Sequence, residues 1–104
     1  MKIGSFEEIV LLSVGALGDE AYGAAVKGLL ETQLGSSPSV GALHSALYRL
    51  EEKGFCTAYE GGINSKRGGR RKKYYQLTSS GRKALEEAQA IRKKLATRIK
   101  GIVY

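Results

Sequence analysis

Apolar residues recur every three or four positions along three segments in the first half of the chain, and this spacing predicts three helices. The first segment, 6–17, carries two apolar rows, so we expect this helix to be buried on more than one side, against its own domain and a second subunit. The second segment, 21–34, and the third, 40–53, each carry one apolar face. A glycine directly follows each segment and is a typical helix end.

Polar residues mark where these helices begin. Ser5 and Glu8 have the spacing of a capping box, in which each side chain satisfies an exposed N–H group of the first turn. Ser39 is placed to cap the third helix after the only proline of the chain. The buried face of the second helix is expected to consist of Ala25, Val26, Leu29, Leu30 and Leu34.

The pattern changes after the third helix. Segments 55–60 and 72–77 read as short strands, with a glycine-rich, charged loop at 61–69 between them. Two such runs around a long loop predict a β-hairpin that projects from the body. Because alternate strand residues face opposite sides, one of Tyr74 and Tyr75 should pack in the core.

A fourth helix, capped by Thr78 or Ser79, is expected to reach Lys100 or slightly beyond. Its apolar positions form a narrow seam of the kind that pairs with a second helix, and Ile102 would extend it. We therefore expect a homodimer whose contacts include Phe6, Ile9, Val10, Leu85, Ala88, Ile91, Leu95 and Ile99.

The expected fold is mainly α with a small β-hairpin, in the order helix, helix, helix, strand, strand, helix. This is the order of a winged helix-turn-helix. Residues 1–77 would form the winged-helix domain and residues 78–104 the dimerisation helix, together one compact unit, because 104 residues fit a single small domain.

The charge of the chain is concentrated in its second half. The formal net charge is +7, yet residues 1–53 carry 4 basic and 7 acidic side chains, whereas residues 54–104 carry 13 basic and 3 acidic. In 66–73 (KRGGRRKK) six of eight residues are basic. A run of this kind indicates a polyanionic partner.

Other classes of protein fit the composition poorly. One cysteine, Cys56, and one histidine, His44, leave no intrachain disulfide and no cysteine- or histidine-rich metal site. No catalytic constellation is recognisable, so we expect neither an enzyme nor a cofactor. The longest apolar stretch is about half of the roughly 20 residues that a membrane span needs. No signal peptide is recognisable, and the expected location is the cytoplasm.

The third helix and the hairpin suit a DNA duplex, because an α-helix fits the major groove and basic side chains bind the adjacent backbone or minor groove. Candidate contacts from the third helix are Ser39, Gly41, Ala42, His44, Ser45, Tyr48 and Arg49. Candidate contacts from the hairpin are Lys66, Arg67, Arg70, Arg71, Lys72, Lys73 and Tyr74. Arg49 has a second interpretation, as the partner of Glu52 on the helix surface.

Three motifs between Ala21 and Gly81 resemble those of PadR-like transcriptional regulators and occur along the chain in the family's order. Segment 41–54 (GALHSALYRLEEKG) resembles the family's G-T-L-Y-P-x-L-x-R-L-E-x-x-G, with Ala42, His44 and Ser45 as departures. Segment 21–23 (AYG) resembles the start of the family's second helix, and 69–81 (GRRKKYYQLTSSG) resembles its wing strand, with Arg71 in place of proline. The resemblance implies a homodimeric winged-helix repressor, with His44 in the position of a backbone-contacting tyrosine.

We therefore expect a sequence-specific DNA-binding regulator, a homodimer on a palindromic double-stranded operator, with a small-molecule effector of unknown identity as a further partner. Two alternatives stay open at this point. One is an RNA-binding or ribosome-associated basic protein, and the other is a winged-helix adaptor between proteins. Competition between duplex DNA and structured RNA at one ionic strength would separate them.

Overall fold

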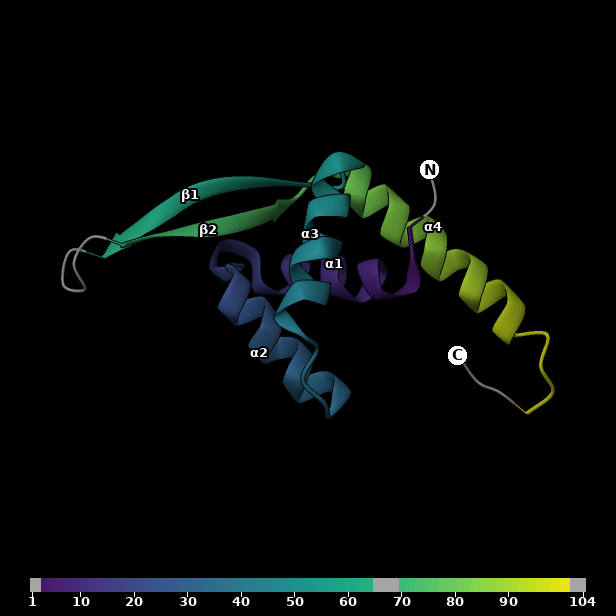
Figure 1. Cartoon of the computed structure of the whole chain (residues 1–104). Helices are drawn as coiled ribbons and strands as arrows, with labels where there is room; N and C mark the ends of the chain where they lie inside the picture. Colours follow the sequence, from purple (N-terminus) through teal and green to yellow (C-terminus); the bar gives the residue numbers. More distant parts are fainter. Residues whose placement is uncertain (1–2, 65–69, 102–104) are drawn as a thin grey trace.

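The computed structural model describes residues 3–64 and 70–101, and the side chains of 62–71 are not described. Within these ranges it contains four α-helices, one 3-10 turn and one antiparallel hairpin, which confirms the expected fold class and element order. The elements are α1 (Ser5–Leu17), η1 (Gly18–Glu20), α2 (Gly23–Leu34), α3 (Val40–Glu52), β1 (Cys56–Asn64), β2 (Arg70–Leu77) and α4 (Ser79–Ala96). The hairpin and α4 project from opposite sides of a body made by α1, α2 and α3 (Figure 1).

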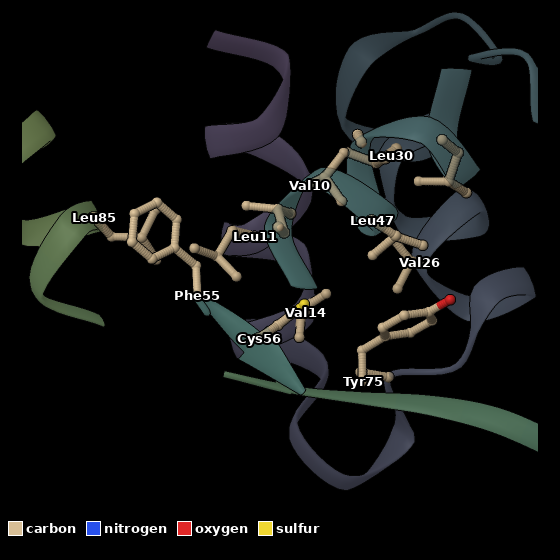
Figure 2. Close-up of a cluster of buried hydrophobic side chains, with 14 residues drawn as sticks. Val10, Leu11, Val14, Val26, Leu30, Leu47, Phe55, Cys56, Tyr75 and Leu85 are labelled. Atoms are coloured by element: carbon tan, nitrogen blue, oxygen red, sulfur yellow. The ribbon is translucent and has the colours of Figure 1, made fainter. Parts of the chain in front are cut away.

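A single core lies between the three helices of the body and the base of the hairpin (Figure 2). Leu43, Leu47 and Leu50 of α3 are each at most 2 % exposed, as their spacing predicts. Tyr75 is buried against this core while Tyr74 is half-buried, which confirms that one tyrosine of the pair faces inward. Leu34, expected on the buried face of α2, is exposed, because α2 ends there and the chain turns away at Gly35.

Two of the predicted caps hold and one is wrong. Ser39 Oγ accepts from the N–H of Ala42 at 3.1 Å, and Thr78 Oγ1 accepts from the N–H of Gly81 at 3.0 Å. The first helix, however, begins one residue earlier than expected, with Gly4 as its N-cap. The Gly4 N–H donates to Glu7 Oε1 at 3.3 Å, and Glu8 turns instead to the fourth helix.

The hairpin is longer than its hydrophobic pattern predicts. β1 runs to Asn64, into the segment expected as a loop, and β2 starts at Arg70, two residues earlier than expected. The pairing is antiparallel, with Tyr59 opposite Tyr74 and an irregularity between Gly61 and Asn64. Backbone hydrogen bonding does not depend on side-chain alternation, so a glycine-rich stretch continues the ladder even though its sequence carries no strand signal.

The fourth helix is shorter than expected and ends at Ala96, about one turn before Lys100. The Thr97 hydroxyl donates to the carbonyl of Lys94 at 2.9 Å, a local bond that competes with helix continuation. Ile99 therefore follows the helix instead of lying on it, and Ile102 falls outside the described residues. In the part of the chain that the structure describes, no helix is long and apolar enough to cross a membrane.

Candidate nucleic-acid interface

The outer face of α3 is the first part of the candidate site. The buried leucines hold one side of this helix against α1, so the opposite side faces solvent. This exposed side carries small residues toward its N-terminal end and longer ones toward its C-terminal end. All seven sequence-predicted residues are exposed, namely the N-cap Ser39 and, on the helix, Gly41, Ala42, His44, Ser45, Tyr48 and Arg49. Tyr48 is 62 % exposed. Its aromatic ring and hydroxyl group are therefore available to contact a binding partner.

A basic hollow of about 530 Å³ lies beside this face. It is bounded by the start of α2, one edge of α3 and the base of β2, and its lining residues are Tyr22, Gly23, Ala24, His44, Lys72, Lys73 and Tyr75. The fold thus brings His44 together with two hairpin lysines that lie 28 and 29 residues later in the sequence. Such a concave, cationic surface favours an anionic ligand.

Tyrosines anchor the base of the hairpin to the body. The Tyr75 N–H donates to the carbonyl of Ala21 at 2.8 Å, and Tyr22 forms an isolated antiparallel bridge with Tyr74. The Tyr74 ring stacks on Tyr59 at 5.6 Å between centroids and meets Tyr22 edge-on at 5.5 Å. The Lys72 ammonium lies 4.0 Å from the centroid of the Tyr22 ring. These contacts fix the direction in which the hairpin leaves the body.

The remaining hairpin candidates are placed only in part. Arg70 and Arg71 open β2, so their backbone belongs to the paired strand. Lys66 and Arg67 lie outside the described residues. Lys73 approaches Glu51 at 3.5 Å, which links the hairpin to the end of α3.

An ion network at the far edge of α3 was not foreseen from the sequence. Arg49 Nε donates to Glu7 Oε2 at 2.7 Å and Lys53 Nζ donates to Glu7 Oε1 at 2.6 Å, so Arg49 pairs with α1 instead of Glu52. Burial disfavours the charge of Glu7, but the hydrogen bonds from Lys53, Arg49 and Gly4 outweigh it and lower the pKa of the carboxyl. The sequence feature that could have indicated this network is the pair of adjacent glutamates, Glu7 and Glu8, at the start of an otherwise apolar helix.

The residues expected at a dimer interface separate into three groups by their burial. Val10 and Leu85 belong to the core of the chain itself, so they are not offered to a partner. Phe6, Ile9 and Ala88 are half-buried, whereas Ile91, Leu95 and Ile99 are 60 %, 61 % and 54 % exposed. The three exposed residues leave an apolar stripe along the end of α4 and just beyond it. A groove of about 720 Å³ adjoins the stripe, between α4 and the start of α1.

Cys56 lies in the core and is 2 % exposed. Burial raises the pKa of its thiol to about 11, so the reactive thiolate is scarce at neutral pH. No cluster of three metal-ligating side chains occurs among residues 3–64 and 70–101.

The chain is similar to several solved structures. A PadR-like transcription factor from Bacteroides fragilis is 25 % identical with a TM-score of 0.74, over 94 % of this chain and 89 % of that one. A PadR family regulator from Clostridium difficile is 27 % identical with a TM-score of 0.68, over 90 % and 97 %. Bacillus subtilis PadR, solved in complex with operator DNA, shares the fold at 22 % identity with a TM-score of 0.66, over 83 % of this chain and 47 % of that one.

A search of curated proteins finds no match. The model of the family described as "Transcriptional regulator PadR-like family" matches residues 11–87, which span the second half of α1, α2, α3, the hairpin and the first half of α4. This family consists of transcriptional regulators and not of enzymes. With three-quarters of the chain matched and PadR-family structures superposing on nearly all of it, the chain belongs to the PadR-like family of transcriptional regulators.

Proposed function

We propose that this regulator is a repressor that binds a palindromic DNA operator as a homodimer. The observation that supports it best is the continuity of two surfaces: the exposed side of α3 borders directly on the basic hollow at His44, Lys72 and Lys73. A helix that fits the major groove and an adjoining cationic patch for phosphates are what a duplex requires. The operator complex of Bacillus subtilis PadR places DNA on a relative with the same fold.

In this proposal the two surfaces have different tasks. The residues that contact the major groove and its edges are the N-cap Ser39 and, on α3, Gly41, Ala42, His44, Ser45, Tyr48 and Arg49. The hairpin residues Lys66, Arg67, Arg70, Arg71, Lys72, Lys73 and Tyr74 contact the flanking backbone or minor groove. Tyr48 is the main candidate for reading bases, because it offers a ring and a hydroxyl that are 62 % exposed in the middle of the α3 face.

The dimer would form through the end of α4. The apolar stripe of Ile91, Leu95 and Ile99 exposes more than half of each side chain, which a second copy would cover. Residues 1–77 would then bind DNA while residues 78–104 pair the subunits, and a two-fold axis would present two α3 helices to a palindromic site. Sedimentation equilibrium tests this arrangement: Leu95→Asp should convert a dimer to a monomer, and a monomeric wild-type chain would contradict it.

Selection of bound sequences from a random duplex library tests the proposal as a whole. We expect recovery of a palindromic site whose half-sites lie about one helical turn apart. Affinity for that duplex should fall with salt, with a slope of about −0.9 per phosphate neutralised. The variant Arg70→Ala/Lys72→Ala/Lys73→Ala should flatten this slope. An unchanged slope would contradict the hairpin assignment, and preference for structured RNA over every duplex would contradict the DNA-binding function.

A further inference from the structure

Two neighbouring carboxylates in the first turn of α1 are buried and point to different parts of the molecule. Glu7 and Glu8 are each 6 % exposed. Glu7 accepts from Arg49 of α3 and from Lys53, the C-cap of α3, at 2.7 and 2.6 Å. Glu8 accepts from Arg92 Nη2 of α4, at 2.8 Å. The same turn of α1 is therefore tied to α3 and its C-cap by one side chain and to α4 by the next.

We propose that Glu7 is a positioning residue for DNA binding: it holds the Nε edge of Arg49 so that the terminal amino groups of that side chain are presented to a backbone phosphate. This inference rests on the proposed function, because it names how one residue of the DNA-binding face is held. Glu7 itself is buried, so in this proposal it acts through Arg49 and not by touching DNA.

The geometry of the guanidinium supports this role. Arginine has five N–H donors in a planar fork, and Glu7 uses only the one on Nε. The two terminal amino groups of Arg49 have no partner among the described residues, and half of the side chain is exposed. Their outer edge matches a phosphate, which accepts two parallel N–H bonds. The buried carboxylate on Nε and a phosphate on the terminal amino groups would therefore use different edges of one guanidinium group.

Fixing the Arg49 side chain before DNA binds would reduce the entropy that is lost on binding. A free arginine loses rotamer freedom when it is fixed on a ligand, and a side chain already fixed in the unbound protein loses less. The second donor, Lys53, keeps Glu7 ionised and anchored from the other oxygen. One carboxylate shared by two cations leaves the group with a net charge of +1, so the cluster still attracts a phosphate.

Glu8 provides a matched control on the adjacent residue. It has the same burial, the same place in the first turn and the same charge, but its partner is on α4. The substitutions Glu7→Gln and Glu8→Gln thus remove one negative charge from nearly the same point. Any long-range electrostatic gain in DNA affinity is common to both, and only Glu7→Gln releases Arg49.

The test measures duplex binding by fluorescence anisotropy for the full-length chain and its variants. The probes are a duplex selected with the wild-type chain from a random library and an unrelated duplex of equal length. Light scattering confirms equal mass and circular dichroism confirms folding. We expect Glu7→Gln to weaken binding of the selected duplex about tenfold, and Glu8→Gln to stay within about twofold of wild type. In an Arg49→Ala background, Glu7→Gln should have no further effect.

Three outcomes would overturn the inference while leaving DNA binding in place. They are equal affinities for Glu7→Gln and Glu8→Gln, a Glu7→Gln loss that persists undiminished with Arg49→Ala, and wild-type affinity for Arg49→Lys. The last variant keeps Glu7 and is informative even where Glu7→Gln does not fold. One ammonium cannot bond the carboxylate and present a two-donor edge, so Arg49→Lys should lose about as much as Glu7→Gln. A wild-type chain that prefers no duplex would instead refute the proposed function, and this inference with it.

Discussion

Replacing Gly81 by alanine should destabilise the protein through a single backbone contact. Gly81 lies in the first turn of α4, where a β-carbon would sit 2.0 Å from the carbonyl oxygen of Phe55 and 2.9 Å from a methyl group of Leu77. Because side-chain carbons do not approach other atoms more closely than 3.0 Å, α4 would have to withdraw by about 1 Å. This close approach also accounts for the glycine that ends the 69–81 motif.

The withdrawal would strain several contacts that join α4 to the body. The Thr78 N–H donates to the same Phe55 carbonyl at 3.2 Å, and Leu85 of α4 packs near Phe55 in the core (Figure 2). Overpacking a tight site costs about 2–3 kcal/mol, which exceeds the roughly 0.5–1 kcal/mol that alanine gains over glycine in a helix. For a domain of this size the net loss corresponds to a fall in Tm of about 5–15 °C.

Gly28 offers a control within the same chain. It lies in the middle of α2, it is exposed, and a β-carbon there would meet no atom within 4 Å. Gly28→Ala should therefore raise the free energy of unfolding by about 0.5–1 kcal/mol. Thermal and urea unfolding followed by circular dichroism would measure both variants, at one protein concentration because self-association shifts the apparent Tm. If Gly81→Ala were as stable as Gly28→Ala, the close approach of α4 to Phe55 would be refuted.

Three further outcomes follow from the buried and capping side chains. The pKa of Glu7 lies below its ordinary value of 4.5, so its ion pairs stabilise the fold above that pH and lose this effect as the pH falls through the folded-state pKa. Urea unfolding at pH 7 and pH 3 should therefore show a larger loss of stability for wild type than for Glu7→Gln, and equal losses would contradict the network. Cys56, with its pKa near 11, should react with a thiol reagent at pH 8 only as fast as the protein opens; rapid labelling of the native state would show that the residue is accessible. The Thr78 hydroxyl donates to the Gly54 carbonyl at 2.7 Å and caps α4. In urea unfolding, Thr78→Ala should therefore lower the free energy of unfolding by about 1–2 kcal/mol, while Thr78→Ser retains most of the stability. Equal free energies of unfolding for Thr78→Ala and wild type would show that the cap contributes nothing.

Most of the fold follows from short-range features of the sequence. The periodicity of apolar residues located α1, α2 and α3, and the caps at Ser39 and Thr78 acted within three residues of the N–H groups they bond. The wrongly predicted helix ends lie where more than one short-range feature of the sequence is compatible with a boundary. Ser5 and Gly4 are both possible starts for α1, and the seam of α4 continued in sequence past the point where the helix stops at Ala96.

The candidate site depended on the sequence and on the tertiary structure in different ways. The exposed face of α3 could be read from a helical wheel, because the positions of its buried leucines determine which side remains outside. The sequence also located the basic run of the hairpin. It did not place His44 beside Lys72 and Lys73 in one hollow, since this depends on how Tyr22 and Tyr74 attach the hairpin to the start of α2.

The ion pairs of α1 show where sequence reasoning ends. Arg49 is 42 residues from Glu7, and Arg92 is 84 residues from Glu8. Helical spacing predicted Glu52 as a partner for Arg49, whereas in the structure Arg49 pairs with Glu7. The sequence by itself determined the elements, the charged segment and the family motifs, because these depend on neighbours a few positions apart. Only the tertiary structure decided which charges meet, because the packing of α1 against α3 and α4 brings buried carboxylates to cations that no local pattern relates.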